Sequence, residues 1–126
     1  MTAQELFDLT AGVMGMTPTN AQTLSEIYLP NLNTILADTF KLENNNRLYN
    51  DLAILTTIPT VNNLNDVLTY QDNVIRNVVM WGVARQLALA DDDVKSSSYA
   101  FQYTQGYNNE SKTINSDITD YYSVGE

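Results

Sequence analysis

Residues 66–90 read DVLTYQDNVIRNVVMWGVARQLALA, and this stretch decides the fold. Its apolar side chains cover more than half of the circumference of a helix, which is typical of a helix buried on most sides. They are Val74, Ile75, Val78, Val79, Trp81, Val83, Leu87 and Leu89. Gly82 costs about 1 kcal/mol relative to alanine inside a helix, which indicates that another helix approaches closely there. We therefore predict that this helix forms the centre of the molecule, with Trp81 in the core.

Two further helices are predicted on its N-terminal side. Thr2 and Glu5 have the spacing of a capping box, so a first helix is expected from about Ala3 to Met14. A second apolar periodicity predicts a helix from about Asn20 to Lys41, which Pro30 should kink or split. The segment that follows is rich in turn-forming asparagines and β-branched residues, which predicts a loop or a small β element before the central helix.

Three consecutive aspartates follow the central helix at Asp91, Asp92 and Asp93. We expect them to end this helix and to cap the next, because acidic side chains stabilise a helix N-terminus. Asp91 and Asp93 also occupy the first and third positions of a calcium loop. The positions of that loop that need glycine and glutamate hold Ser96 and Gln102, so the capping role is favoured and no metal is expected.

Tyrosines recur every four residues after the aspartates, at Tyr99, Tyr103 and Tyr107. This spacing predicts an aromatic stripe on a fourth helix that ends near Tyr107. The stripe fits packing on the central helix and fits an interface with a partner, and the sequence leaves both interpretations open.

The last residues are mostly Asn, Ser, Thr, Asp and Tyr and hold too few aliphatic side chains to form a core. We predict one helical domain over residues 1–108 and a C-terminal arm over residues 109–126. The arm is either a disordered end or a segment that is flexible until it binds a partner. Its candidate anchors are Ile114, Ile118, Tyr121, Tyr122 and Val124.

The composition excludes several classes of function. The chain has 126 residues, a formal net charge of -9, no histidine and no cysteine. Most nucleophile, acid–base and metal sites need one of those two residues, and the glycines form no phosphate-binding loop, so we expect no enzyme and no cofactor. Six scattered basic residues argue against gripping nucleic acid. The longest apolar stretch, Val78–Ala84, is too short to span a bilayer, and no signal peptide is recognisable, so a cytoplasmic protein is expected.

Three stretches together resemble the head–tail connector, or adaptor, proteins of tailed bacteriophages. They are LTYQD at 68–72, VVMWGVARQLALADDD at 78–93 and SYAFQY at 98–103. In that family a helix with a proline–tyrosine–glycine pattern ends in an acidic run, and a helix with tyrosines and glutamines follows. Here the glycine is Gly82 and the aromatic positions are Tyr99 and Tyr103. Met80 and Trp81 stand where the family often has proline and tyrosine.

The resemblance implies a mainly α fold, a small bundle of about four helices with an extended C-terminal arm. It implies a virion structural protein at the head–tail junction, assembled in the host cytoplasm. Such proteins form a ring, commonly twelvefold, beneath the portal protein, extend the DNA channel and dock a stopper or tail-completion protein. Viral DNA passes through without sequence-specific binding, and the arm reaches the portal or a neighbouring copy. Another phage neck protein, or a small acidic inhibitor, stays open as an alternative.

Overall fold

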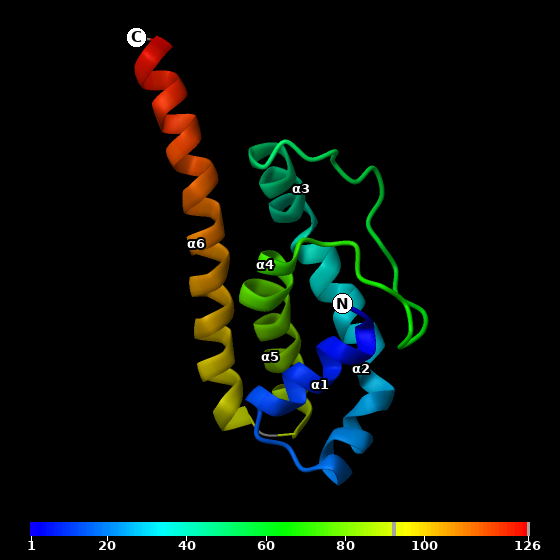
Figure 1. The fold of residues 1–126 in the computed structure, drawn as a ribbon. Helices are drawn as coiled ribbons and strands as arrows, with labels where there is room; N and C mark the ends of the chain where they lie inside the picture. Colours follow the sequence, from blue (N-terminus) through cyan, green and yellow to red (C-terminus); the bar gives the residue numbers. More distant parts are fainter. Residues whose placement is uncertain (92, 126) are drawn as a thin grey trace.

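The computed structural model describes the backbone of residues 1–91 and 93–125, and side chains outside residues 18–20, 91–93 and 112–126. Its regular elements are all helical over this part, which confirms the predicted mainly α bundle (Figure 1). The elements are α1 (Ala3–Val13), α2 (Pro18–Asp38), α3 (Phe40–Tyr49), α4 (Asp72–Val74), η1 (Ile75–Val79), α5 (Met80–Asp91) and α6 (Asp93–Gly125). The short α4, the π-helical turn η1 and α5 follow without a break and form one central rod.

The central rod is the most deeply buried element, as predicted. Val74, Val78, Val83 and Leu87 are fully buried, and α1, α2 and α6 surround them. The rod begins at Asp72, so the predicted start six residues earlier is wrong.

Residues 66–68 are extended because their backbone bonds to the N-terminus. The Ala3 amide donates to the Asp66 carbonyl, and the Leu68 amide donates to the Met1 carbonyl, both at 2.9 Å. These bonds frame a single β-bridge between Thr2 and Val67, and no strand forms in the described part of the chain. The predicted loop or small β element is therefore a loop.

The capping box that predicts α1 is present. The Glu5 amide donates to the Thr2 hydroxyl, and the Thr2 amide donates to the Glu5 carboxylate. These two hydrogen bonds satisfy amides at the start of the helix, and the bond from the Thr2 backbone amide to the Glu5 carboxylate is the main cause that lowers the pKa of Glu5.

The second predicted helix breaks at Thr39 rather than at Pro30. Pro30 lies within α2 on its exposed side, where solvent can satisfy the carbonyl that proline leaves without a donor. The Thr39 hydroxyl donates to the Ile35 carbonyl at 2.7 Å, and α3 begins at the next residue. The asparagines at 44–46, expected in a turn, lie inside α3.

The last helix, α6, packs along the central rod and touches α3. Its backbone continues to Gly125, so the predicted end near Tyr107 is wrong, and its C-terminal turns extend past the bundle (Figure 1). The break between α5 and α6 falls in the aspartate run, as predicted. The capping role predicted for Asp91, Asp92 and Asp93 concerns side chains outside the described part.

Two glycines allow α6 and α2 to approach the central rod. A Cβ atom on Gly82 would lie 2.9 Å from side-chain atoms of Ile35 and Tyr103, which confirms the predicted close approach. A Cβ atom on Gly106 would lie 2.0 Å from the carbonyl oxygen of Asn77, within the π-helical turn. The backbone of α6 therefore lies directly against the turn at this point, a contact that the sequence did not indicate.

Candidate functional site

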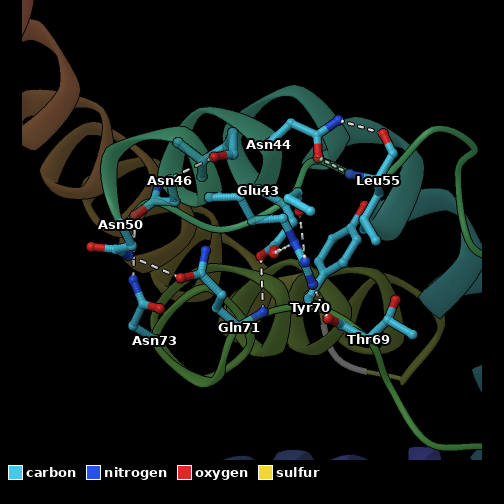
Figure 2. A network of polar contacts seen from close by, with 12 residues as sticks. Glu43, Asn44, Asn46, Asn50, Leu55, Thr69, Tyr70, Gln71 and Asn73 are labelled. Atoms are coloured by element: carbon cyan, nitrogen blue, oxygen red, sulfur yellow. Dashed lines mark hydrogen bonds and ion pairs between the residues drawn. The ribbon is translucent and has the colours of Figure 1, made fainter.

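The connection between α3 and α4, residues 50–71, is a long segment without helix or strand. Loops of this length in a small domain usually have a function. Two asparagines hold its backbone as a neighbouring strand would. The Asn44 amide bonds both backbone groups of Leu55, at 2.8 and 3.0 Å (Figure 2), and Asn33 bonds those of Val61, at 2.8 and 2.9 Å.

A buried ion pair holds both ends of the same loop. Glu43 is fully buried. One of its carboxylate oxygens accepts a hydrogen bond from the backbone amide of Gln71 at 3.0 Å, and the other accepts one from Arg47 Nε at 2.6 Å (Figure 2). The other Arg47 nitrogens donate to the carbonyls of Ala53 and Thr69. Burial raises the pKa of Glu43, although its hydrogen bonds to the Gln71 amide and to Arg47 oppose the rise. Both oxygens are bonded and shielded from solvent, so we assign this carboxylate a structural role.

A second set of amides connects α3, the central rod and α6. Asn73 donates to one carboxylate oxygen of Glu110 at 3.0 Å, and Asn77 donates to the other at 3.2 Å. Asn73 also lies 3.4 Å from the side-chain oxygen of Asn46. Because Glu110 lies just before the turns of α6 that extend past the bundle, these bonds fix the direction in which α6 leaves it.

The tyrosine stripe packs on the central rod. The rings of Tyr99 and Trp81 stack with centroids 6.0 Å apart, and those of Tyr103 and Tyr107 meet edge to face at 6.4 Å. Tyr99 is 9% exposed, and burial raises the pKa of Tyr103 to about 12. The stripe therefore contributes to packing within the monomer, the first of its two interpretations.

Trp81 lies at the margin of the core and is only partly buried, which corrects its predicted central position. The reason is local. Beside Tyr99, it borders a shallow polar pocket whose lining includes Asn77, Gln102 and Gln105, so one edge of the ring remains open to solvent.

Large apolar side chains are exposed on the loop and on the outer side of α6. Leu52, Ile54 and Ile58 of the loop are 46%, 49% and 50% exposed, and Phe101 of α6 is 64% exposed. The sequence did not single out these four residues for contact with a partner. Each of them could have been found in the sequence as a large apolar residue that lies outside the periodic apolar faces of the helices.

The described part of the chain contains no group of three or more Asp and Glu side chains placed to hold a metal ion. None of its helices is long and apolar enough to cross a membrane.

The predicted partner-binding side chains lie outside the described ones. They are Ile114, Ile118, Tyr121, Tyr122 and Val124.

No protein-family model, no curated protein and no solved structure matches the chain.

Proposed function

We propose that the protein is a virion structural protein of a tailed bacteriophage, the adaptor ring that connects the portal protein to the tail. The observation that carries this proposal is the course of α6. Among the side chains that the structure describes, Glu110 makes the last hydrogen bonds of α6 to the bundle, whereas the backbone continues as a helix to Gly125. About four turns, or roughly 22 Å, therefore extend beyond these bonds.

Four turns of helix alone in water are only marginally stable, since most helical stability in proteins comes from packing. In the sequence, Ile114, Ile118 and Tyr121 follow one another at intervals of four and three residues, the spacing of one helical face. A face of this kind is suited to a groove on another protein. In the resemblance to phage adaptors, that protein is the portal.

The charge of the chain suits a wall around DNA. The net charge of -9 repels phosphates, so a ring of copies would line a channel without retaining the DNA. Two of the six basic residues are neutralised within the monomer, since Arg47 pairs with Glu43 and Arg76 pairs with Asp72 at 2.8 Å.

The test is a pull-down on portal rings of the phage that encodes the chain. The predicted arm begins at Asn109, but Glu110 bonds to the bundle, so the truncated protein should end at Ser111. We expect the full chain to bind the portal and the truncated chain to lose binding while keeping its helical circular dichroism spectrum.

A matched pair of variants separates the apolar face from the mere presence of the helix. Ile114→Asp with Ile118→Asp should abolish binding, whereas Asn115→Asp with Thr119→Asp adds the same charge and should preserve it. If the full chain does not bind portal rings, the adaptor function is refuted. Equal binding by the truncated chain would show that the C-terminal turns of α6 do not carry the contact.

A further inference from the structure

We infer that a groove between two segments of the loop binds an extended peptide that carries basic side chains. The walls of the groove are residues 59–61 on one side and residues 66–70 on the other. None of its lining residues belongs to α6, so this site is separate from the C-terminal turns that the proposed function uses. Peptide binding here does not depend on the adaptor function.

The groove is lined by apolar side chains that belong to the core. Its volume is about 320 Å³, at the lower end of the range for ligand pockets in proteins. Leu36 of α2 and Val61, Leu68 and Tyr70 of the loop line it, and all four are buried. An aliphatic side chain of a ligand would therefore be removed from water in this groove.

One wall of the groove is the open edge of an extended segment. The Asp66 carbonyl and the Leu68 amide bond to the N-terminus, on either side of the bridge between Thr2 and Val67. In this antiparallel pattern, the N–H and C=O of Val67 point away from Thr2. Val67 lines the groove and residues 1–4 do not, so these two backbone groups face the groove. Neither group has a hydrogen-bond partner in the described part of the chain.

These two backbone groups select a peptide as the ligand. A free donor and a free acceptor on one residue match the backbone of an added strand, which supplies an acceptor and a donor at the same spacing. The apolar lining would then take one of the alternate side chains of that strand. The walls are already fixed, because Asn33 bonds both backbone groups of Val61 and Arg47 bonds the Thr69 carbonyl. The loop therefore loses little conformational entropy when a peptide binds.

The charge of the groove selects a basic peptide. Asp66 lies in its lining, and no lysine or arginine does. The amides of Asn62 and Asn63 bond Oδ2 of Asp66 at 3.0 and 3.1 Å, which fixes the carboxylate in place. A lysine or arginine of the peptide can pair with this carboxylate, and the net charge of -9 attracts it from a distance. A second copy fits poorly, since pairing two Val67 edges would bring two Asp66 carboxylates into one interface.

The test uses a fluorescein-labelled heptapeptide in which lysine and valine alternate, with lysine at both ends, and measures its binding by fluorescence anisotropy. The control for charge is the same peptide with glutamate in place of lysine. We expect the lysine peptide to bind, and the glutamate peptide to bind at least about tenfold more weakly at low salt. Asp66→Asn keeps an oxygen for the two amides and should weaken binding of the lysine peptide by about threefold.

A matched pair of variants at Val67 tests the backbone pairing. Val67→Pro removes the N–H that faces the groove and no hydrogen bond of the fold, whereas Val67→Ala keeps this N–H. The Val67 side chain is 68% exposed, so its loss alone should change the affinity little. We expect Val67→Pro to weaken peptide binding by about fivefold or more, and Val67→Ala to weaken it by less than about twofold. Circular dichroism checks that both variants are folded.

Hydrogen exchange of the wild-type protein gives a readout that needs no variant. The Leu68 amide, which bonds to Met1, should be protected in the free protein, and the Val67 amide should become protected only with the lysine peptide bound. Three results would overturn the inference: no binding of the lysine peptide at millimolar concentration, a Val67 amide that stays unprotected in the complex, or equal affinity of Val67→Pro and Val67→Ala. Self-association of wild type that Val67→Pro abolishes would show instead that this edge pairs two copies.

Discussion

Replacing Gly106 by alanine should detach α6 from the π-helical turn of the central rod. The added Cβ would lie 2.0 Å from the Asn77 carbonyl oxygen, whereas a Cβ in a protein essentially never comes within 3.0 Å of a heavy atom from another part of the chain. The two backbones must therefore separate by about 1 Å or more, because a carbonyl in a helix cannot rotate away as the end of a side chain can. The bonds from Asn73 and Asn77 to Glu110, one turn further along α6, would lengthen with them.

The expected loss of stability follows from opposing contributions. Alanine in place of glycine inside a helix gains about 1 kcal/mol. Overpacking of the helix contact costs about 1–3 kcal/mol, and weakening a hydrogen bond to a charged group costs about 1.5–3 kcal/mol, less where the group is exposed. We expect the free energy of unfolding to fall by about 2–4 kcal/mol, and Tm to fall by about 8–15 °C.

Urea denaturation and thermal unfolding, followed by circular dichroism, measure this change. The matched control is Gly12→Ala, because a Cβ at Gly12 in α1 has no atom within 4 Å, and this variant should gain up to about 1 kcal/mol. Gly82→Ala should fall between the two, since its Cβ would meet only side-chain atoms. A Gly106→Ala protein as stable as wild type would refute the assigned contact between α6 and the turn.

Asp51→Gly should raise the free energy of unfolding by about 0.5–1 kcal/mol, because Asp51 follows the end of α3 with φ 58°, where glycine is favoured; an unchanged urea midpoint would contradict this backbone geometry. Glu43→Gln should lower the free energy of unfolding by about 2–4 kcal/mol, because the NH2 group of an amide cannot accept one of the two existing hydrogen bonds. In a double-mutant cycle, Glu43→Leu combined with Arg47→Met should cost less stability than either single change. Burial raises the pKa of the Glu43 carboxyl above 4.5, so the native state binds the carboxyl proton more tightly than the unfolded state does. The contribution of Glu43 to the free energy of unfolding should therefore fall as pH rises from 4.5 through the raised pKa. Urea denaturation at several pH values should show this decrease in wild type and not in Glu43→Gln. Thr2→Ala should cost about 1 kcal/mol by removing the capping box with Glu5, as measured by urea denaturation.

Local patterns in the sequence were sufficient where an element depends on its own residues. The capping box of Thr2 and Glu5 places the start of α1, and the apolar periodicity identifies the central rod as the buried element. Gly82 was recognised because glycine weakens a long apolar helix unless a neighbouring element needs the space that a side chain would fill. The aspartate run gave the boundary between α5 and α6 because acidic side chains favour the start of a helix over its interior.

Patterns failed where an element depends on residues far away in the chain. The asparagines at 44–46 favour a turn by themselves, yet Asn44 bonds Leu55 and Asn46 lies against Asn73 within a helix. The central rod begins at Asp72 and not at the predicted Asp66, because the backbone of residues 66–68 pairs with the N-terminus. Gly106 was missed because its role depends on the π-helical turn at Asn77, which apolar periodicity does not reveal.

The way in which the loop is held explains why its apolar side chains are exposed. Val61, Leu68 and Tyr70 anchor the loop in the hydrophobic core. Asn33, Asn44 and Arg47 also hold the loop backbone through hydrogen bonds, so Ile54 and Ile58 need not contribute to the core. A buried polar network of this kind adds little net stability compared with apolar packing, but it fixes one geometry. A loop held in one geometry would not lose further conformational freedom if a partner bound its exposed side chains.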